Sequence, residues 1–154
     1  MEKLNFDSGI REYKINGNGV LRFNPSDPNV YARFMDAMDQ IRAVETRLVD
    51  KAKEMETATD REGSGAAVLK LMREADKETK KILSDVFGEG NDFDKILGGV
   101  NMLAVAGNGQ RVITNLLEAL QPIMVEGAKN CTMQQTDAAV AQAKQNRAQR
   151  RSQK

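Results

Sequence analysis

The sequence predicts a mainly α-helical protein with an N-terminal β-hairpin, about four helices of which one is long, and a disordered basic C-terminal tail. Apolar and polar residues alternate on both sides of a glycine-rich turn near residue 17, which is typical of a hairpin. Apolar residues then recur every three or four positions along several segments, as they do on one face of a helix. Beyond residue 128, Val140 is the only aliphatic side chain larger than Ala.

The hairpin is expected within residues 10–24, where four apolar residues alternate with polar ones: Tyr13, Ile15, Leu21 and Phe23. A three-residue loop at residues 17–19, with Gly19 in the left-handed conformation, sets Ile15 opposite Leu21. The same register sets Tyr13 opposite Phe23. A two-residue turn sets Ile15 opposite Arg22 instead, so we favour the three-residue loop. Because a lone hairpin is marginal in water, its apolar face must pack against a helix or extend a sheet with another chain.

The long helix is expected from Pro28 to about Thr57. Ser26 or Asp27 is the predicted N-cap, and Pro28 suits the first turn. One face carries apolar residues at spacings of three, four or seven: Val30, Phe34, Met38, Ile41, Leu48, Ala52 and Met55. Such a helix is about 45 Å long, which is more than a small domain can cover, so we expect its charged far end to project.

A second helix is expected after a break at Arg61–Gly65 and should end at Gly88. Its predicted apolar side consists of Val68, Leu69, Met72, Ala75, Ile82, Val86 and Phe87. A short helix follows, capped by Asn91 or Asp92 and interrupted by Gly98 and Gly99. Its apolar residues are Phe93, Ile96, Leu97, Val100 and Leu103.

The last predicted helix follows a turn at residues 107–109, is kinked or ended near Pro122, and stops at Gly127. Its apolar residues are Val112, Ile113, Leu116, Leu117, Leu120 and Met124. We therefore place a single domain at residues 1–128. Residues 129–154, with six basic residues and one acidic residue, are expected to be a flexible tail that is disordered alone. A partner could induce a helix in this tail from Thr136 onward.

The residue types argue against an enzyme. The chain has no His and a single Cys, which excludes imidazole bases, the usual zinc sites and an internal disulfide. The glycine clusters at residues 16–19, 88–90 and 107–109 lack the spacing of phosphate-binding loops and are interpreted as turns. Asp92 and Asp94 could bind a divalent cation, but capping a helix is the simpler interpretation. No catalytic residue, metal or cofactor is predicted.

The expected location is the cytoplasm. The first residues lack the apolar core of a signal peptide, and no stretch approaches the roughly 18 apolar residues needed to cross a bilayer. The basic tail is the only segment whose charge could select a partner, through Lys144, Arg147, Arg150 and Arg151. It has no aromatic residue on which a base could stack, so protein binding or simple solubilisation is favoured over nucleic-acid binding.

Three features together carry a family resemblance. They are the hairpin with Ile15-Asn16-Gly17, the segment 21–28 that opens the long helix, and the segment 87–93 in the helical half. In this layout residues 10–128 resemble the tail assembly chaperones of long-tailed bacteriophages and prophages of Gram-positive bacteria. The resemblance implies a non-enzymatic protein of virion morphogenesis that coats the tape measure protein and recruits tail tube subunits.

Two alternatives stay open: a structural tail or head-tail connector protein of a phage, and a small nucleic-acid-binding protein that uses the basic tail. A homo-oligomer is also expected, because the hairpin has an open edge and the long helix has more apolar surface than one small domain covers. The candidate partner-binding residues are Tyr13, Ile15, Leu21, Phe23, Phe34, Met38, Lys144, Arg147, Arg150 and Arg151.

Overall fold

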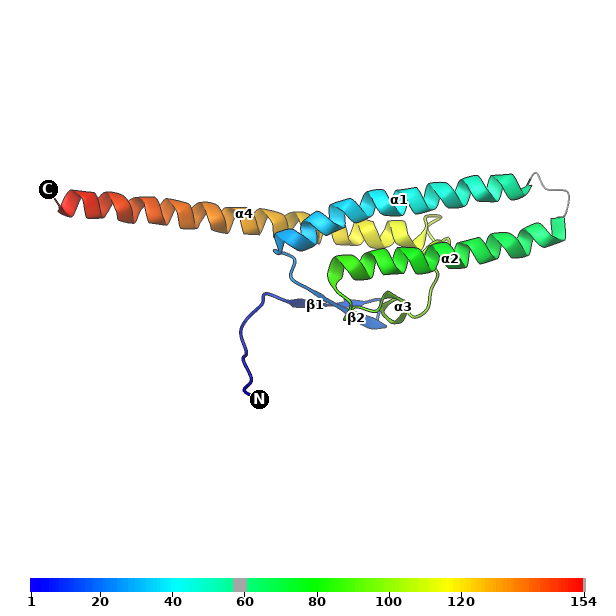
Figure 1. Cartoon of the computed structure of the whole chain (residues 1–154), viewed down its shortest axis with the longest axis horizontal. Helices are drawn as coiled ribbons and strands as arrows, with labels where there is room; N and C mark the ends of the chain where they lie inside the picture. The colour runs from blue at the N-terminus through cyan, green and yellow to red at the C-terminus, as the bar shows by residue number, and fades with distance from the viewer. Residues whose placement is uncertain (57–60, 154) are drawn as a thin grey trace.

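The computed structural model, which describes residues 1–56 and 61–153, confirms a mainly helical fold with an N-terminal hairpin. The described elements are β1 (Arg11–Ile15), β2 (Gly19–Phe23), α1 (Pro28–Glu56), α2 (Arg61–Phe87), α3 (Phe93–Ile96) and α4 (Val112–Ser152). Helices α1 and α2 lie side by side, with the start of α4 against α1 and the hairpin and α3 beneath α2 (Figure 1). The C-terminal part of α4 extends well beyond the other elements.

An aromatic cluster joins the hairpin to the helices. Phe87, at the end of α2, has its ring centroid 4.7 Å from that of Phe23 in β2, 6.3 Å from Phe34 in α1 and 5.9 Å from Phe93 in α3. All four rings are buried. Burying a Phe side chain stabilises a fold by about 1.5–3 kcal/mol, so this cluster fixes four elements against one another.

The hairpin forms with a register that differs from the predicted one. Ile15 pairs with Gly19 and Tyr13 with Leu21, while Phe23 lies opposite Arg11. The loop has three residues as expected, but they are residues 16–18, and Gly19 belongs to β2. The turn forms earlier because Asn16 and Gly17 both adopt positive φ, the conformation that an Asn-Gly pair favours in hairpins, and the Asn18 amide donates to the Ile15 carbonyl.

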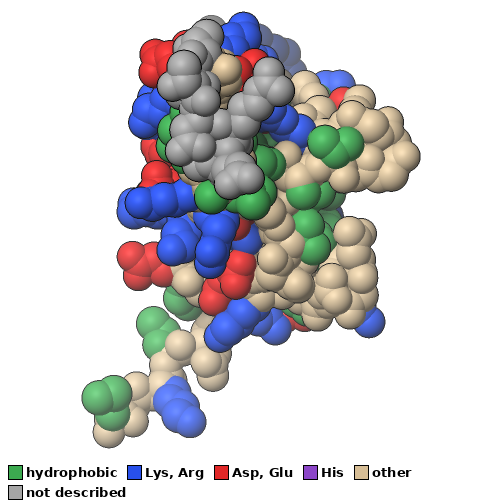
Figure 2. All heavy atoms as spheres, turned by 90° about the vertical axis from the view of Figure 1, so that its right-hand side faces the viewer, with side chains coloured by type: hydrophobic (Ala, Val, Ile, Leu, Met, Phe, Trp, Pro, Cys, Tyr) green, Lys and Arg blue, Asp and Glu red, His purple; other side chains and the backbone are tan. Residues whose placement is uncertain are grey.

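Helix α1 confirms the predicted long helix. The Asp27 carboxylate accepts a hydrogen bond from the Asn29 amide at 2.9 Å, so Asp27 rather than Ser26 holds the first turn. The predicted end at Thr57 lies outside the described residues. The far end of α1 lies beside the start of α2, and Figure 2, which faces that end, shows acidic and basic side chains intermixed on its surface.

The predicted break at Arg61–Gly65 is wrong, because these residues are the first turns of α2. The penalty for one Gly in a helix is only about 1 kcal/mol, which α2 can tolerate. Leu69, predicted on the apolar side, is exposed. Helix α3 is a single turn rather than a longer helix, because Gly98 and Gly99 both have positive φ and end it; Val100 is consequently exposed.

Helix α4 corrects the expectations for the C-terminal part of the chain, because it continues without a stop through Pro122 and Gly127 to Ser152. Pro122 costs one backbone hydrogen bond, but the buried Leu120 and Met124 on either side hold the helix in the core. Gly127 is buried against Pro25, and a Cβ atom there would overlap the carbonyl oxygen of Pro25. It therefore permits close packing and does not end the helix.

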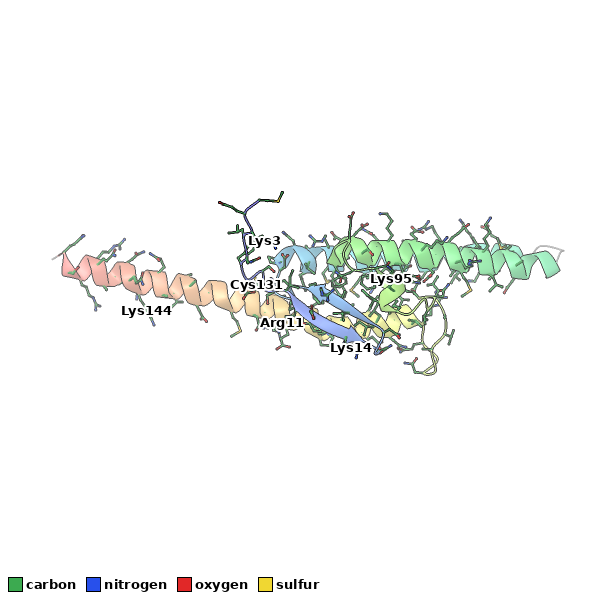
Figure 3. All side chains as sticks on the ribbon, turned by 90° about the horizontal axis from the view of Figure 1, so that it is seen from below. Lys3, Arg11, Lys14, Lys95, Cys131 and Lys144 are labelled. Atoms are coloured by element: carbon green, nitrogen blue, oxygen red, sulfur yellow. The ribbon has the colours of Figure 1, made fainter. Side chains whose placement is uncertain are left out.

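The expected disordered tail is helical over residues 129–152. Ala, Gln, Lys and Arg, which dominate this segment, are good helix formers even where nothing packs against them. Figure 3 shows Lys144 on the part of α4 that extends past the rest of the molecule. We call residues 112–128 proximal α4 and residues 129–152 distal α4.

Candidate interaction surfaces

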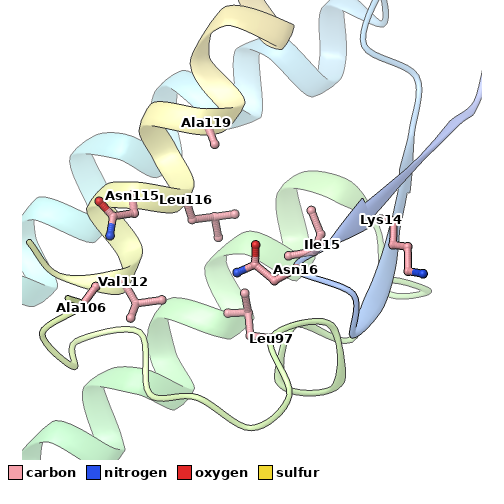
Figure 4. Close-up of a pocket in the computed structure, with 9 residues that line it drawn as sticks. All are labelled: Lys14, Ile15, Asn16, Leu97, Ala106, Val112, Asn115, Leu116 and Ala119. Carbon is pink, nitrogen blue, oxygen red and sulfur yellow. The ribbon is translucent and has the colours of Figure 1, made fainter. Parts of the chain in front are cut away.

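A groove runs between β1 and proximal α4. Its larger hollow, of about 400 Å³, is shown in Figure 4, where Val112 and Leu116 of α4 face Leu97 and Ile15. Lys14, Asn16, Ala106, Asn115 and Ala119 complete its lining. A second hollow of about 200 Å³ follows the same two elements and is lined by Arg11, Tyr13, Pro25, Ser26, Ile123, Glu126, Gly127 and Asn130. We call the two hollows together the β1–α4 groove.

The two edges of the hairpin differ in whether their backbone groups are satisfied. On β2, the Asn91 side chain donates to the Arg22 carbonyl and accepts from the Arg22 amide, both at 2.8 Å. At Arg22, this edge is therefore occupied by a buried side chain that imitates a neighbouring strand. The backbone amide and carbonyl of Arg22 point away from β1. In an antiparallel pair the same groups of its partner Glu12 then point away from β2, and so do those of Lys14 two residues on. The edge of β1 that borders the groove is open.

The predicted partner-binding residues fall into three groups. Leu21, Phe23 and Phe34 are 0%, 3% and 1% exposed, so in this structure they are core residues that a partner cannot reach. They are buried because the hairpin folds onto α1 and α2 and leaves its apolar face against its own helices. The other predicted residues are at least partly accessible.

Tyr13, Ile15 and Met38 are half-buried. Tyr13 stacks on Phe23 with a centroid separation of 5.2 Å and, like Ile15, lines the β1–α4 groove. Met38 lines a separate hollow of about 200 Å³ between α1 and α4. The hairpin residues and Met38 therefore belong to different surfaces, although all of them were predicted as partner contacts.

Lys144, Arg147, Arg150 and Arg151 are all exposed on distal α4. Lys144, Arg147 and Arg151 are spaced three and seven residues apart and so share one helical face. The structure places them far along the extended helix, away from the groove (Figure 3).

An apolar stripe that begins at the end of proximal α4 and continues along distal α4 was not predicted from the sequence. Val125, Met133 and Val140 are 39%, 62% and 48% exposed, and their spacing of eight and seven residues keeps them on one side of the helix. Near its start, Tyr31, Val125, Ala128, Lys129, Thr132 and Met133 line an open hollow of about 370 Å³. The helical spacing is present in the sequence, but residues 129–154 were expected to be disordered, so no helical face was assigned to them.

A charge cluster centred on the buried Lys80 anchors the chain between α2 and α4. Lys80, whose side chain is 9% exposed, donates to Asp76 at 2.8 Å and to Asp94 at 2.6 Å. Burial disfavours the ammonium, but the hydrogen bonds to Asp76 and Asp94 outweigh it, so the pKa of Lys80 is raised. Asp76 also accepts a hydrogen bond from the Met102 amide at 2.8 Å. The cluster therefore stabilises the fold.

The two acidic residues considered for a cation have other partners. The Asp92 carboxylate accepts from the amides of Asp94 and Lys95 and is the N-cap of α3, which confirms the capping interpretation. The hydrogen bond and charge of Lys80 lower the pKa of Asp94. Within the described part of the chain, no three His, Cys, Asp or Glu residues are grouped as metal ligands would be.

None of the helices described in residues 1–56 and 61–153 is long and apolar enough to span a membrane. No protein-family model matches the sequence, and no curated protein or solved structure is significantly similar to it.

Proposed function

We propose that this protein is a non-enzymatic tail assembly chaperone of a long-tailed phage or prophage, acting in the host cytoplasm. In this role it binds the tape measure protein and recruits tail tube subunits. The observation that carries the proposal is distal α4, an exposed helix that continues from the core and presents an unpartnered face.

The shape of distal α4 suits a long helical partner. A helix that extends beyond its own domain can lie along another helix, with Val125, Met133 and Val140 packing as helix-in-groove contacts do. Lys144, Arg147 and Arg151 can pair with acidic residues on such a partner. A tape measure protein, implied by the family resemblance, is a partner of this kind.

The chemistry of the stripe also suits temporary binding. Its three large apolar residues are separated by Ala, Thr and polar residues, so each turn buries little apolar surface. Met is an adaptable contact residue that repacks against different partners. A chaperone that must leave as tube subunits arrive needs an interface that is specific and easily released.

Co-purification with the tape measure protein tests this proposal. We expect the full chain to co-purify with it, and a chain that carries Met133→Asp and Val140→Asp to lose most of this binding. Ala138→Asp with Gln145→Asp is the matched control, because it adds the same two charges, also seven residues apart, on the opposite side of α4. All variants should melt at the temperature of the unaltered chain, since these positions are exposed.

Two outcomes would contradict the proposal. Undiminished co-purification of the double variant would show that distal α4 is not the recognition surface. Presence of the protein in mature virions would support the structural connector instead, because a chaperone leaves before the particle is complete.

A further inference from the structure

We propose that residues 1–10 of one copy bind as an added β-strand in the β1–α4 groove of a second copy. Residues 1–10, here called the N-terminal arm, run from β1 away from the body of the protein (Figure 1). This assembly needs no tape measure protein, so its test is independent of the function proposed above.

The N-terminal arm has the pattern of a strand that lacks its sheet. Leu4 and Phe6 alternate with polar residues and are 87% and 79% exposed. Figure 2 shows the arm hanging below the body, with hydrophobic side chains surrounded by solvent. Large apolar side chains on an extended segment are unfavourable in water and indicate a surface that becomes covered.

The β1–α4 groove has what such a strand requires. The open edge of β1 offers the outward backbone groups of Glu12 and Lys14, which can pair with the backbone of an added strand. Behind this edge, Tyr13, Ile15 and Leu116 supply an apolar lining on the face that Leu4 and Phe6 would cover. On the opposite edge, at β2, Asn91 already occupies the backbone groups of Arg22.

The arm that enters the groove comes from a second copy because its own chain holds it elsewhere. The Gly9 amide donates to the Asp7 carboxylate at 2.8 Å, which forms a turn where the arm meets the body. The Asn24 side chain donates to the Ser8 carbonyl at 3.1 Å and fixes this turn beside β2. None of residues 1–10 lines either hollow of the groove.

Charge favours a parallel register between the arm and β1. With Leu4 beside Tyr13 and Phe6 beside Ile15, Glu2 lies beside Arg11 and Lys3 beside Glu12. The antiparallel register that places Leu4 opposite Ile15 and Phe6 opposite Tyr13 brings Asp7 opposite Glu12. A shift of that register by two residues brings Lys3 opposite Lys14. Of these three registers, only the parallel one pairs opposite charges while Leu4 and Phe6 cover Tyr13 and Ile15.

Each copy donates an arm at one place and accepts an arm at another, so the contact is head-to-tail. Such contacts produce rings or open chains, depending on the rotation between neighbours. Reciprocal exchange of arms between two copies would stop at a dimer, whereas one-way exchange would give a mass that rises with concentration beyond that of a dimer.

Sedimentation of the full chain at rising concentration tests the proposal. We expect oligomers at tens of micromolar, and Leu4→Asp with Phe6→Asp should weaken association at least about tenfold by placing charge on the apolar face. Ala119→Glu, on an exposed position that lines the groove, should weaken it similarly. Leu69→Asp, an exposed apolar position on α2 outside the groove, is the matched control and should associate normally.

Mixing the two variants distinguishes binding of one copy's arm by another copy's groove from a general loss of association. The arm variant retains a free groove and the Ala119→Glu variant retains a free arm, so an equimolar mixture should form dimers although neither variant associates alone. A strictly monomeric unaltered chain at 100 micromolar or above, normal association of the arm variant, or a mixture that stays monomeric would each overturn the proposal.

Cross-linking tests the register. In a Cys131→Ser background, Lys3→Cys with Glu12→Cys should give disulfide-linked oligomers that reducing agent separates. Asp7→Cys with Glu12→Cys, which matches the antiparallel register, should give few. Cross-linking of the second pair alone would overturn the parallel register.

Discussion

Proximal and distal α4 form one continuous helix, yet they are helical for different physical reasons. In proximal α4, Ile113, Leu120 and Met124 are 1–3% exposed and pack into the domain core. Distal α4 buries almost nothing, and its helicity rests on the propensity of Ala, Gln, Lys and Arg. Tertiary packing tolerates the Pro122 and Gly127 of the first half, whereas propensity supports the second half without contacts.

This difference bears on how each half can function. A helix fixed by packing positions the β1–α4 groove, because Val112, Leu116 and Ala119 hold their places relative to β1. A helix held by propensity alone is only marginally stable, so a partner can select or extend it at small entropic cost. For the two proposed contacts, proximal α4 would therefore supply a rigid surface, and distal α4 an adaptable one.

The largest expected effect comes from truncating a core side chain in proximal α4. Leu120→Ala should lower the free energy of unfolding by about 2–5 kcal/mol, because it leaves a cavity among packed side chains. Val140→Ala in distal α4 should change it by less than about 0.5 kcal/mol, since Val140 is half exposed. Urea denaturation of both variants measures the contrast. Equal effects would mean that the two halves are not held differently.

Adding one methyl group at Gly127 should have the next largest effect. Gly127→Ala should destabilise the fold by about 1–3 kcal/mol, because the new Cβ atom would overlap the Pro25 carbonyl and force α4 away from it. The matched control is Gly65→Ala in α2, where a Cβ atom meets nothing within 4 Å. That change should stabilise the protein by about 0.5–1 kcal/mol through helix propensity. A stabilising Gly127→Ala would show that this contact is loose.

The charge cluster at Lys80 predicts a graded pH effect on proximal α4. Met102, whose amide Asp76 binds, accepts a hydrogen bond from the Ile113 amide at 2.8 Å, so the cluster supports the first turn of α4. The pKa of Lys80 is raised above 10.5 in the folded state. Its contribution to the stability of the fold is therefore complete below pH 10.5 and is lost as pH rises through the folded pKa.

Tm should therefore fall more steeply above pH 10.5 for the unaltered chain than for Lys80→Met, in which the titrating group is absent. Asp94 has the opposite sign, because its pKa is lowered below 3.8 and its contribution is lost as pH falls. Thermal melts across both pH ranges measure these slopes. Identical alkaline slopes for the two proteins would show that Lys80 does not link pH to stability.

Much of the fold could be predicted because hydrophobic periodicity determined it. The spacing of Val30, Phe34 and Ile41 specified α1, and alternation at Tyr13 and Leu21 specified the hairpin. The ends of the helices were harder to predict where one residue type can serve two structural roles. Gly127 resembles a helix stop in sequence, but whether Gly ends a helix or permits close packing depends on Pro25, which lies far away in the sequence.

The candidate surfaces could be predicted only in part. The basic residues of distal α4 were visible as a charge cluster, and the open hairpin edge followed from having only two strands. The difference between the two edges depends on Asn91, which pairs with the Arg22 backbone of β2 and which the sequence marked only as a possible cap. The β1–α4 groove could not be predicted, because it exists only where two elements separated by about 100 residues come together.

The smallest expected effect on stability comes from removing distal α4 altogether. A chain that ends at Lys129 should keep its Tm within the error of the measurement, because residues 130–152 contribute almost no buried apolar surface. Its ellipticity at 222 nm should nevertheless fall in proportion to the helical residues removed. The two observables separate helix content from stability.

A peptide of residues 129–154 tests whether distal α4 is helical without proximal α4. Without tertiary contacts its helicity should be partial and should fall gradually on heating, because an isolated helix of this length is marginal in water. In the full chain, proximal α4 supplies the nucleus, so distal α4 should be more helical than the peptide. A truncated chain with a clearly lower Tm would show that distal α4 packs on the domain, and the distinction between its two halves would then fail.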